Sequence, residues 1–334
     1  MRIGIDAMGG DHAPAEPVAG ALAAREMLKE GDRIVLIGDE KAIREKLAAT
    51  PNWAEWIEIC HAPENIGMDE SPVVALRQKP NSSIAVMAEM QADGRLDAGI
   101  SAGSTGAFVA ASQMRLRRLR GAHRPGIAVV APTFHGPVVI CDVGANVNCR
   151  PTHLYQYGVM ASVYSKSICG IKNPRVGLLS IGEEDAKGTD LVKQTRALLK
   201  ADKRINYIGN VEGRDVFGGV VDVMVTEGFV GNVMLKLMEG MAGGVMKSML
   251  KELVSEMPQL AEKVMRAAKA VAVRYDYNEY GGAPLLGVGG ISIICHGASD
   301  YRAIKNAVRV VEEYSRQQVN EQIAELLADG AEAQ

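Results

Sequence analysis

Short segments rich in Gly, Ser, Thr, Asn and Asp recur along the chain, each after an apolar run and before a helical pattern. Glycine lets backbone N–H groups approach an anion closely, and a helix start offers the positive end of its dipole. Open α/β sheets bind ligands at the carboxyl ends of their strands, so we expect these segments to share one cleft that holds an anion such as phosphate. They are Asp6–Pro14, Ser101–Ala107, Asp142–Asn146, Ser180–Asp190, Thr226–Asn232 and Tyr280–Gly290, followed by His296–Ser299.

Three of these segments supply candidate phosphate ligands. Ser101–Ala107 places hydroxyl and backbone N–H donors around one helix start, although a Ser or Thr N-cap with packing glycines gives the same pattern. Asp6–Pro14 has adjacent glycines but neither the G-x-G-x-x-G of a dinucleotide site nor the Gly-Lys-Ser/Thr of a Walker loop. With the Asn of Asp142–Asn146, the predicted phosphate-binding residues are Gly9, Gly10, Ser101, Gly103, Ser104, Thr105, Gly106 and Asn146.

Four residues of the same segments could act on reacting groups. Lys187 precedes a helix, a position that is poor for helix electrostatics and good for neutralising an anion, although an exposed loop lysine looks the same. Asn232 lies at the start of a long helix and could donate an amide hydrogen bond. His12 and His296 are the histidines that lie in these segments, and each could serve in acid–base work or in structural hydrogen bonding.

The composition disfavours several other functions. Aromatic residues make up only 4% and the net charge is −3, which argues against base stacking and attraction to nucleic acid. The chain has no H-E-x-x-H, no G-x-S-x-G and no Cys-x-x-Cys among its 5 Cys, so we expect neither a metal nor another cofactor, although scattered carboxylates could hold a divalent metal. We expect Cys141, Cys169 and Cys295 to be buried filler. Because there is no signal peptide and no apolar stretch long enough to cross a bilayer, we expect a cytoplasmic protein.

A basic run, RLRRLRGAHR, covers Arg115–Arg124 at the end of a predicted helix. It could be a solvated helix end that complements the dipole, or a docking patch for an acidic protein. The predicted docking residues are Arg115, Arg117, Arg118 and Arg120.

The spacing of apolar residues predicts the elements that must position these segments. Strands alternating with helices predict an α/β fold, with a mainly parallel sheet flanked by helices on both sides. Strands are predicted at 3–5, 34–37, 57–60, 98–101, 127–131, 138–141, 176–181 and 223–226. Helices are predicted near 14–29, 39–49, 82–92, 104–119, 151–168, 188–201, 230–256, 259–273 and 299–328.

Residues 230–273 depart from this alternation, because two helical patterns follow each other without a strand and predict a protruding helical hairpin. The apolar stripe of this hairpin could pack in the protein core. It could also form half of a four-helix dimer interface, which we favour because an apolar stripe needs a partner surface. The tip at Met257–Pro258 could meet a lipid surface. Apolar residues at spacings of three or four predict one stripe on the first helix: Met234, Met238, Met241, Val245, Met249, Leu253 and Met257.

The segments together resemble the phosphate acyltransferase (PlsX) family of bacterial phospholipid synthesis over roughly residues 1–327. The residues that carry the resemblance are DAMGGDHAP at 6–14, KPNSS at 79–83, SAGSTGA at 101–107, RPGIAV at 124–129, DVGAN at 142–146, PRVGLLSIGEEDAKGTDLVKQT at 174–195, IGNVEGRD at 208–215, VTEGFVGNVMLK at 225–236, EYGGAPLLGV at 279–288 and HGAS at 296–299. Two positions depart from the family pattern, with Ser104 in place of Asn and Glu227 in place of Asp.

The resemblance implies a reaction and a setting. Family members convert acyl-acyl carrier protein and inorganic phosphate into acyl phosphate, which a membrane glycerol-3-phosphate acyltransferase then uses. It also implies a two-lobed fold similar to isocitrate and isopropylmalate dehydrogenases and phosphotransacetylase, a homodimer, and peripheral association with the inner membrane face. We therefore expect residues 1–330 to form one two-lobed catalytic domain and residues 331–334 a disordered tail.

Other readings remain open on the sequence. The alternatives are a phosphotransacetylase-like enzyme that uses acyl-CoA, an NAD-dependent decarboxylating dehydrogenase of the same fold, and a dimeric membrane-surface scaffold without turnover. In the favoured reading, the helix start at Gly103–Gly106 binds phosphate, Lys187 neutralises charge or assists the oxyanion, and Asn232 donates a hydrogen bond. His12 or His296 takes the phosphate proton.

Overall fold

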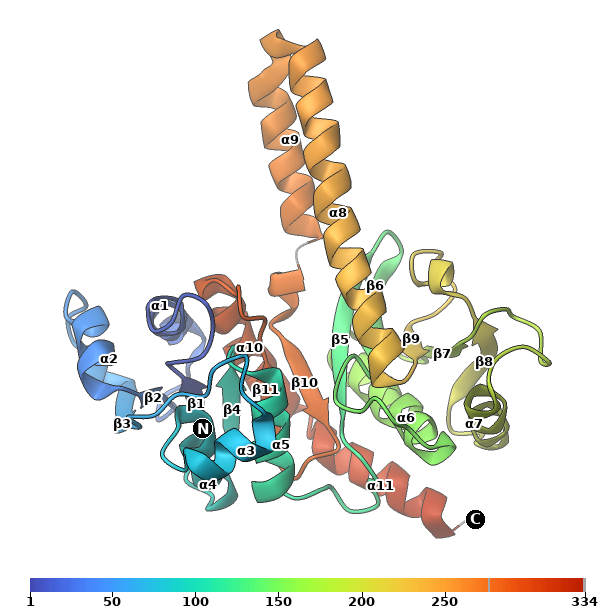
Figure 1. The fold of residues 1–334 in the computed structure, drawn as a ribbon, viewed down its shortest axis with the longest axis horizontal. Helices are drawn as coiled ribbons and strands as arrows, with labels where there is room; N and C mark the ends of the chain where they lie inside the picture. Colours follow the sequence, from blue (N-terminus) through green and yellow to red (C-terminus); the bar gives the residue numbers. More distant parts are fainter. Residues whose placement is uncertain (276, 333–334) are drawn as a thin grey trace.

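In the computed structural model, which describes residues 1–275 and 277–332, one sheet of 11 strands runs through the molecule (Figure 1). Its order is β3-β2-β1-β4-β11-β10-β5-β6-β9-β7-β8. The strands are β1 (Arg2–Asp6), β2 (Arg33–Gly38), β3 (Ile57–His61), β4 (Ala98–Ser101), β5 (Gly126–Thr133), β6 (Gly136–Cys141), β7 (Arg175–Leu179), β8 (Asn206–Val211), β9 (Val223–Val225), β10 (Ala283–Leu286) and β11 (Ile291–Ile294).

Helices cover both faces of this sheet, as the alternating pattern predicted. They are α1 (Ala15–Ala23), α2 (Glu40–Leu47), α3 (Pro72–Gln78), α4 (Ser83–Ala92), α5 (Thr105–Arg115), α6 (Pro151–Ser167), α7 (Asp190–Ala201), α8 (Gly228–Glu256), α9 (Ala261–Arg274), α10 (Tyr301–Arg316) and α11 (Val319–Glu332). Single 3₁₀ turns lie at Ala24–Met27, Trp53–Glu55, Gly213–Val216, Pro258–Leu260 and Tyr277–Tyr280.

The first lobe is built on the parallel strands β3, β2, β1, β4 and β11. Successive residues of β2 point to opposite faces: Ile34 and Leu36 pack with the α1 and α10 side, whereas Val35 and Ile37 pack with the α4 and α5 side. These four side chains are at most 2% exposed, which explains why the strand reads as an uninterrupted apolar run.

The second lobe is built on β6, β9, β7 and β8, which are parallel to one another. β10 and β5 join the lobes through three antiparallel pairings, β11 with β10, β10 with β5, and β5 with β6. The strands of the second lobe therefore run opposite to those of the first. The loops after the strands therefore form two groups, one on each lobe.

Several elements differ from the prediction where local signals were weak. The structure adds α3, β8, β10 and β11, and β10 occupies part of the predicted loop Tyr280–Gly290. The helix predicted at 104–119 ends at Arg115, and the one at 299–328 divides at Gln317 and Gln318 because Gln318 takes a positive φ of 51°. α11 extends to Glu332, so residues 331 and 332 of the predicted tail are helical, while residues 333 and 334 lie outside the described residues.

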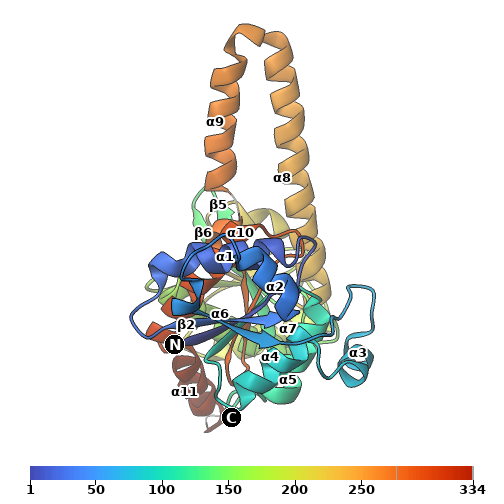
Figure 2. The same cartoon turned by 90° about the vertical axis from the view of Figure 1, so that its left-hand side faces the viewer.

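The predicted hairpin is present as α8 and α9, and it stands away from both lobes (Figures 1 and 2). The surroundings of the predicted stripe change along α8, because the helix extends beyond the lobes. Met234 and Met238 pack against the core of the lobes, whereas Met241, Val245 and Met249 are 48–60% exposed. Among the described residues, no helix has the length and apolar character needed to span a membrane.

Candidate functional site

The first group of loops gathers around the buried carboxylate of Asp6 at the end of β1. Ser101 Oγ donates to Asp6 Oδ2 at 2.7 Å, and the backbone N–H of Gly103 donates to Ser101 Oγ at 3.0 Å. A Cβ on Gly9 would lie 2.6 Å from the Gly103 nitrogen, so the two glycine loops touch. Burial raises the pKa of Asp6, against the effect of the hydrogen bond from Ser101. The predicted residues Gly9, Ser101 and Gly103 are thus brought together.

The start of α5 lies in this group, and its first residues differ in their exposure and contacts. Ser104 is the N-cap and its Oγ accepts the backbone N–H of Ala107 at 3.4 Å, so the capping interpretation describes this side chain. Thr105 and Gly106 are exposed in the first turn of α5. Pro72 of α3 covers Gly106, because a Cβ there would lie 2.7 Å from the proline ring.

His296 joins the first group through the loop after β11. Gly297 O accepts the backbone N–H of Asp11 at 2.8 Å, and a Cβ on Gly10 would lie 3.0 Å from the same oxygen. The Ala298 N–H donates to His296 Nδ1 at 3.2 Å, which fixes the ring. His12 lies in the β1 loop and is exposed. The loops that carry the two predicted histidines are therefore in direct contact.

The second group of loops forms around Asp142 at the end of β6. This buried carboxylate accepts backbone N–H groups from Ile127, Gly144, Ala145 and Asn146 at 2.8–3.1 Å. Burial raises the pKa of Asp142, while these hydrogen bonds act in the opposite direction. The side-chain amide of Asn146 donates to Pro125 O at 2.6 Å and to the Tyr157 hydroxyl at 2.9 Å. The structure thus gives the Asn146 amide group two structural partners.

α8 begins in this second group. Glu227 caps the helix by accepting the N–H groups of Phe229 and Val230, and Gly228 N donates to Asn146 O at 2.8 Å. Asn232 lies beside the Asp142 loop, because a Cβ on Gly144 would be 4.0 Å from the Asn232 Cβ. Asn232 is also exposed, so its amide can reach a ligand.

Lys187 lies in the loop after β7 and is exposed. The loop is a turn in which Lys187 N donates to Glu184 O at 3.0 Å, and Asn210 Nδ2 donates to the same oxygen. Among residues 1–275 and 277–332, no hydrogen bond or ion pair joins Lys187 to Asn232, so the Lys187 side chain remains available to a ligand.

The two groups of loops meet through a residue that the sequence analysis did not select. Lys236 of α8 lies one helical turn beyond Asn232, and its Nζ is 3.0 Å from His296 Nε2 and 2.8 Å from Glu239 Oε2. α8 thus crosses from the second group to the first. The available signal was the spacing of four residues between Asn232 and Lys236, which places both on one face of the helix.

The basic run lies mostly outside a helix. Residues 116–125 form a loop after α5, at the end of α5 away from Ser104. A hollow of about 690 Å³ is lined by Gln113, Arg117, Arg118, Leu119, Gly121, Ala122, His123 and Arg124. Burial lowers the pKa of His153 nearby, and the charges of Arg124, His123 and Arg150 lower it further. The predicted Arg117 and Arg118 thus belong to a larger cationic surface, whereas Arg115 and Arg120 do not line the hollow.

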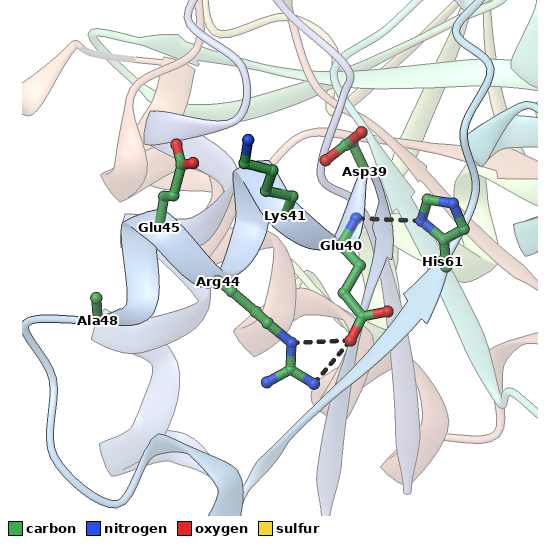
Figure 3. Close-up of a pocket in the computed structure, with 7 residues that line it drawn as sticks. All are labelled: Asp39, Glu40, Lys41, Arg44, Glu45, Ala48 and His61. Carbon is green, nitrogen blue, oxygen red and sulfur yellow. Dashed lines mark hydrogen bonds and ion pairs between the residues drawn. The ribbon is translucent and has the colours of Figure 1, made fainter.

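A second hollow, of about 620 Å³, lies over α2 and contains none of the predicted site residues (Figure 3). Its charges are of both signs, and the pair Arg44 and Glu40 satisfies itself at 2.7 Å along one helix. His61 Nδ1 accepts the backbone N–H of Glu40 at 3.2 Å (Figure 3). With three acidic and two basic side chains, this hollow offers no positive charge excess for an anion.

Neither thiol chemistry nor a metal cluster emerges from the described residues. Cys141 and Cys295 are buried, as predicted, whereas Cys169 is only partly buried. Burial raises the pKa of Cys295 to about 12. Among residues 1–275 and 277–332, no group of three or more His, Cys, Asp or Glu side chains could hold a metal ion.

Comparison with known proteins decides the family. Residues 1–322 match a family model described as "Fatty acid synthesis protein". A phosphate acyltransferase from Trichlorobacter lovleyi is 46% identical over 331 residues, which are 98% of this chain and 95% of the relative. One from Pelotomaculum thermopropionicum is 50% identical over 315 residues, which are 94% of this chain and 91% of the relative.

The chain belongs to the phosphate acyltransferase family. It is therefore an acyltransferase. The closely spaced glycine loops and the start of α8 accordingly belong to a phosphate acyltransferase, and this membership argues against the dehydrogenase and scaffold alternatives.

Solved structures show how this phosphate acyltransferase is related in fold. A phosphotransacetylase from Streptococcus pyogenes superposes with a TM-score of 0.60 at 13% identity, covering 96% of this chain and 94% of that one. A protein described as a 4-hydroxythreonine-4-phosphate dehydrogenase from Salmonella typhimurium gives 0.50 at 13% identity, covering 93% and 99%. At these identities the likeness concerns the fold alone, and it confirms the expected α/β architecture.

Proposed function

We propose that the protein transfers a fatty acyl group from acyl-acyl carrier protein to inorganic phosphate and releases acyl phosphate for phospholipid synthesis. Membership of the phosphate acyltransferase family is the observation that carries this proposal. The geometry supports it, because the touching Gly9 and Gly103 loops lie beside the start of α5, and a helix start is suited to bind an anion.

The proposed reaction requires positioning more than strong base catalysis. A phosphate oxygen attacks the thioester carbonyl carbon, a C–O bond forms, and collapse of the tetrahedral intermediate breaks the C–S bond. The carrier leaves as a thiolate that takes up the phosphate proton. Phosphate is already nucleophilic at neutral pH, so the enzyme must hold the dianion and stabilise the oxyanion.

Within this scheme the exposed Asn232 donates its amide to the reacting oxygens, and Lys187 neutralises the phosphate charge. His296 or His12 relays the phosphate proton. Lys187→Ala and Asn232→Ala should each lower turnover at saturating phosphate by at least about tenfold, as loss of a charge-assisted hydrogen bond costs roughly 1.5–3 kcal/mol. Near-normal turnover of both variants would remove these assignments.

The direct test is phosphate-dependent release of the free carrier thiol from palmitoyl-acyl carrier protein, with EDTA present and palmitoyl-CoA in parallel. Release that saturates with phosphate and prefers the carrier protein supports the proposal. A preference for CoA would favour the phosphotransacetylase-like alternative. Absence of release from either donor by a folded protein would contradict acyl transfer to phosphate.

The acidic carrier protein is proposed to dock on the basic surface after α5. Arg117, Arg118 and Arg124 line one hollow there, and Arg150 lies nearby in charge contact with His153. The double variant Arg117→Glu/Arg118→Glu should raise the KM for the acylated carrier at least tenfold and leave that for acyl-CoA unchanged. Lys41→Glu/Lys46→Glu on α2 is the matched charge control; equal effects in both variants would rule out a local docking surface.

A homodimer through the hairpin is proposed from the exposed face of α8. Met241 and Val245 are 58% and 60% exposed, and the neighbouring Gly240 and Gly244 have open space where a side chain would be. Glycine lowers helix stability, so its use suits a second helix packed closely on this face. Met241→Glu/Val245→Glu should give monomers in sedimentation velocity, and Lys41→Glu/Lys46→Glu, on α2, should not. A dimer in both variants would exclude this face.

Peripheral association with the inner membrane face is proposed for the hairpin tip, where Leu260 is 38% exposed. This position would deliver acyl phosphate to a membrane glycerol-3-phosphate acyltransferase, while the body of the protein stays in the cytoplasm. Leu260→Glu should weaken flotation with liposomes, whereas Met114→Glu, on α5, should not. Unchanged flotation of the Leu260 variant would remove the tip from consideration.

A further inference from the structure

We propose that Lys236 is a phosphate-binding residue that acts jointly with Asn232 and holds the anion beside His296 of the other lobe. This inference rests on the proposed acceptor, inorganic phosphate. The observation behind it is the placement of an ammonium group between the two groups of loops, 3.0 Å from His296 Nε2.

The first step of the argument is the geometry of α8. Asn232 and Lys236 are four residues apart in one helix, so their Cβ atoms are roughly 6 Å apart on the same face. A phosphate that accepts one hydrogen bond from each of two donors, each about 2.8 Å long, spans a gap of that order. The amide and the ammonium can therefore bind oxygens of the same phosphate.

The second step concerns what surrounds the ammonium. Lys236 Nζ is 2.8 Å from Glu239 Oε2, which lies one turn further along α8. An ammonium has three donors, and Glu239 accepts from one of them. Because Ala298 N–H donates to His296 Nδ1, the ring carries a proton on Nε2, and the 3.0 Å contact places two N–H donors side by side. Since the Lys236 side chain is 48% exposed, solvent or an anion reaches the remaining donors. Lys236 is thus oriented by protein partners and accessible to an anion at once.

The third step is the connection to the first lobe. Ala298 N–H holds His296 Nδ1, and Gly297 O binds the N–H of Asp11 in the glycine loop after β1. The Lys236 contact therefore ends on a ring that is fixed to the first group of loops. Binding of phosphate by Lys236 and Asn232 would place the anion next to His296, the proposed proton relay.

A kinetic comparison separates this role from that of a structural tie. Lys236→Met should raise the KM for inorganic phosphate by about 10- to 100-fold, as expected for a lost charge-assisted hydrogen bond, with kcat changed less than about threefold. Lys236→Arg should restore most of the loss. Glu239→Gln should lower the KM for phosphate, because the carboxylate competes with the anion for the same ammonium. Lys247→Met, on an exposed part of α8, is the matched control.

A binding measurement supplies a readout that does not depend on turnover. Inorganic phosphate should raise the melting temperature of the wild-type protein and of Lys247→Met, and this shift should disappear in Lys236→Met. Unchanged KM for phosphate and an unchanged phosphate-induced shift in Lys236→Met would overturn the inference. A lower melting temperature of Lys236→Met with normal phosphate kinetics would also overturn it, because that result would show a structural contact between the lobes without a role in phosphate binding. If the wild-type protein neither binds phosphate nor releases carrier thiol, the proposed function itself fails.

Discussion

Replacing Gly9 with alanine tests whether contact between the β1 and β4 loops sets the acceptor site. The added Cβ would lie 2.5 Å from Asp6 Oδ2 and 2.6 Å from the Gly103 nitrogen. Ordinary contacts begin at about 3.4 Å, so both contacts must lengthen, by roughly 0.8–0.9 Å. Neither contacting group is the flexible end of a long side chain, because Gly103 N is backbone and Asp6 is fixed by the Ser101 hydroxyl.

The displacement should act on both stability and activity. Overpacking a filled site costs about 1–3 kcal/mol of the free energy of unfolding. A misplacement of about 1 Å between reacting groups costs roughly 100-fold in rate. We therefore expect kcat/KM for phosphate to fall about 100-fold in Gly9→Ala, while the protein still folds.

The assay is thiol release at varied phosphate, with urea denaturation to measure the free energy of unfolding. Gly213→Ala is the control, because a Cβ at that glycine would meet no atom within 4 Å. It should match the wild type in phosphate kinetics. If Gly9→Ala retains its kcat/KM for phosphate, the loops do not form the acceptor site and the reasoning fails.

Three further outcomes are expected. Ser104→Ala removes the N-cap of α5 and should lower the free energy of unfolding by about 1 kcal/mol in urea denaturation, with little change in kcat, since the hydroxyl is used in capping. The Arg204 guanidinium lowers the pKa of Asp202 to about 2 in the folded protein. The ionised Asp202 therefore stabilises the folded state fully above the unfolded pKa near 4, and this contribution is lost as pH falls toward 2. Asp202→Asn should therefore flatten the decline in unfolding free energy over that window by about 1 kcal/mol, allowing for solvent screening; an unchanged slope would refute this assignment. Burial raises the pKa of Cys149 to about 11 and of Cys169 to about 12, so iodoacetamide at pH 7 should leave thiol release intact, and rapid inactivation would contradict that.

The strands with buried, β-branched runs could be predicted from the sequence, because a strand that is buried on both faces has apolar residues at successive positions. β4 was placed at its observed bounds, and β2 within one residue at each end. β8 was missed because it contains Tyr207, Gly209 and Asn210 with only its last two residues buried. α3 was missed because its seven residues give too short a pattern to recognise.

The site was harder to predict because it depends on strand direction. Residues within one group, such as Gly9 and Gly103, could be associated from their places after parallel strands. The reversal at β10 and β5 is not encoded in either strand alone, so the separation of Lys187 and Asn232 from the first group could not be foreseen. Lys236 was overlooked for the same reason, since its partner His296 lies 60 residues away.

Because α8 is one continuous helix, a movement of its outer end also moves the residues near its start. Lys236 lies 9 residues from the N-cap Glu227, whereas the end of the helix at Glu256 lies 29 residues from it. For a rigid helix that pivots at Glu227, the far end travels about three times as far as Lys236. A lateral displacement of about 3 Å at the hairpin tip would therefore move Lys236 by about 1 Å. Misplacements of about 1 Å at a reacting centre are large enough to change reaction rates.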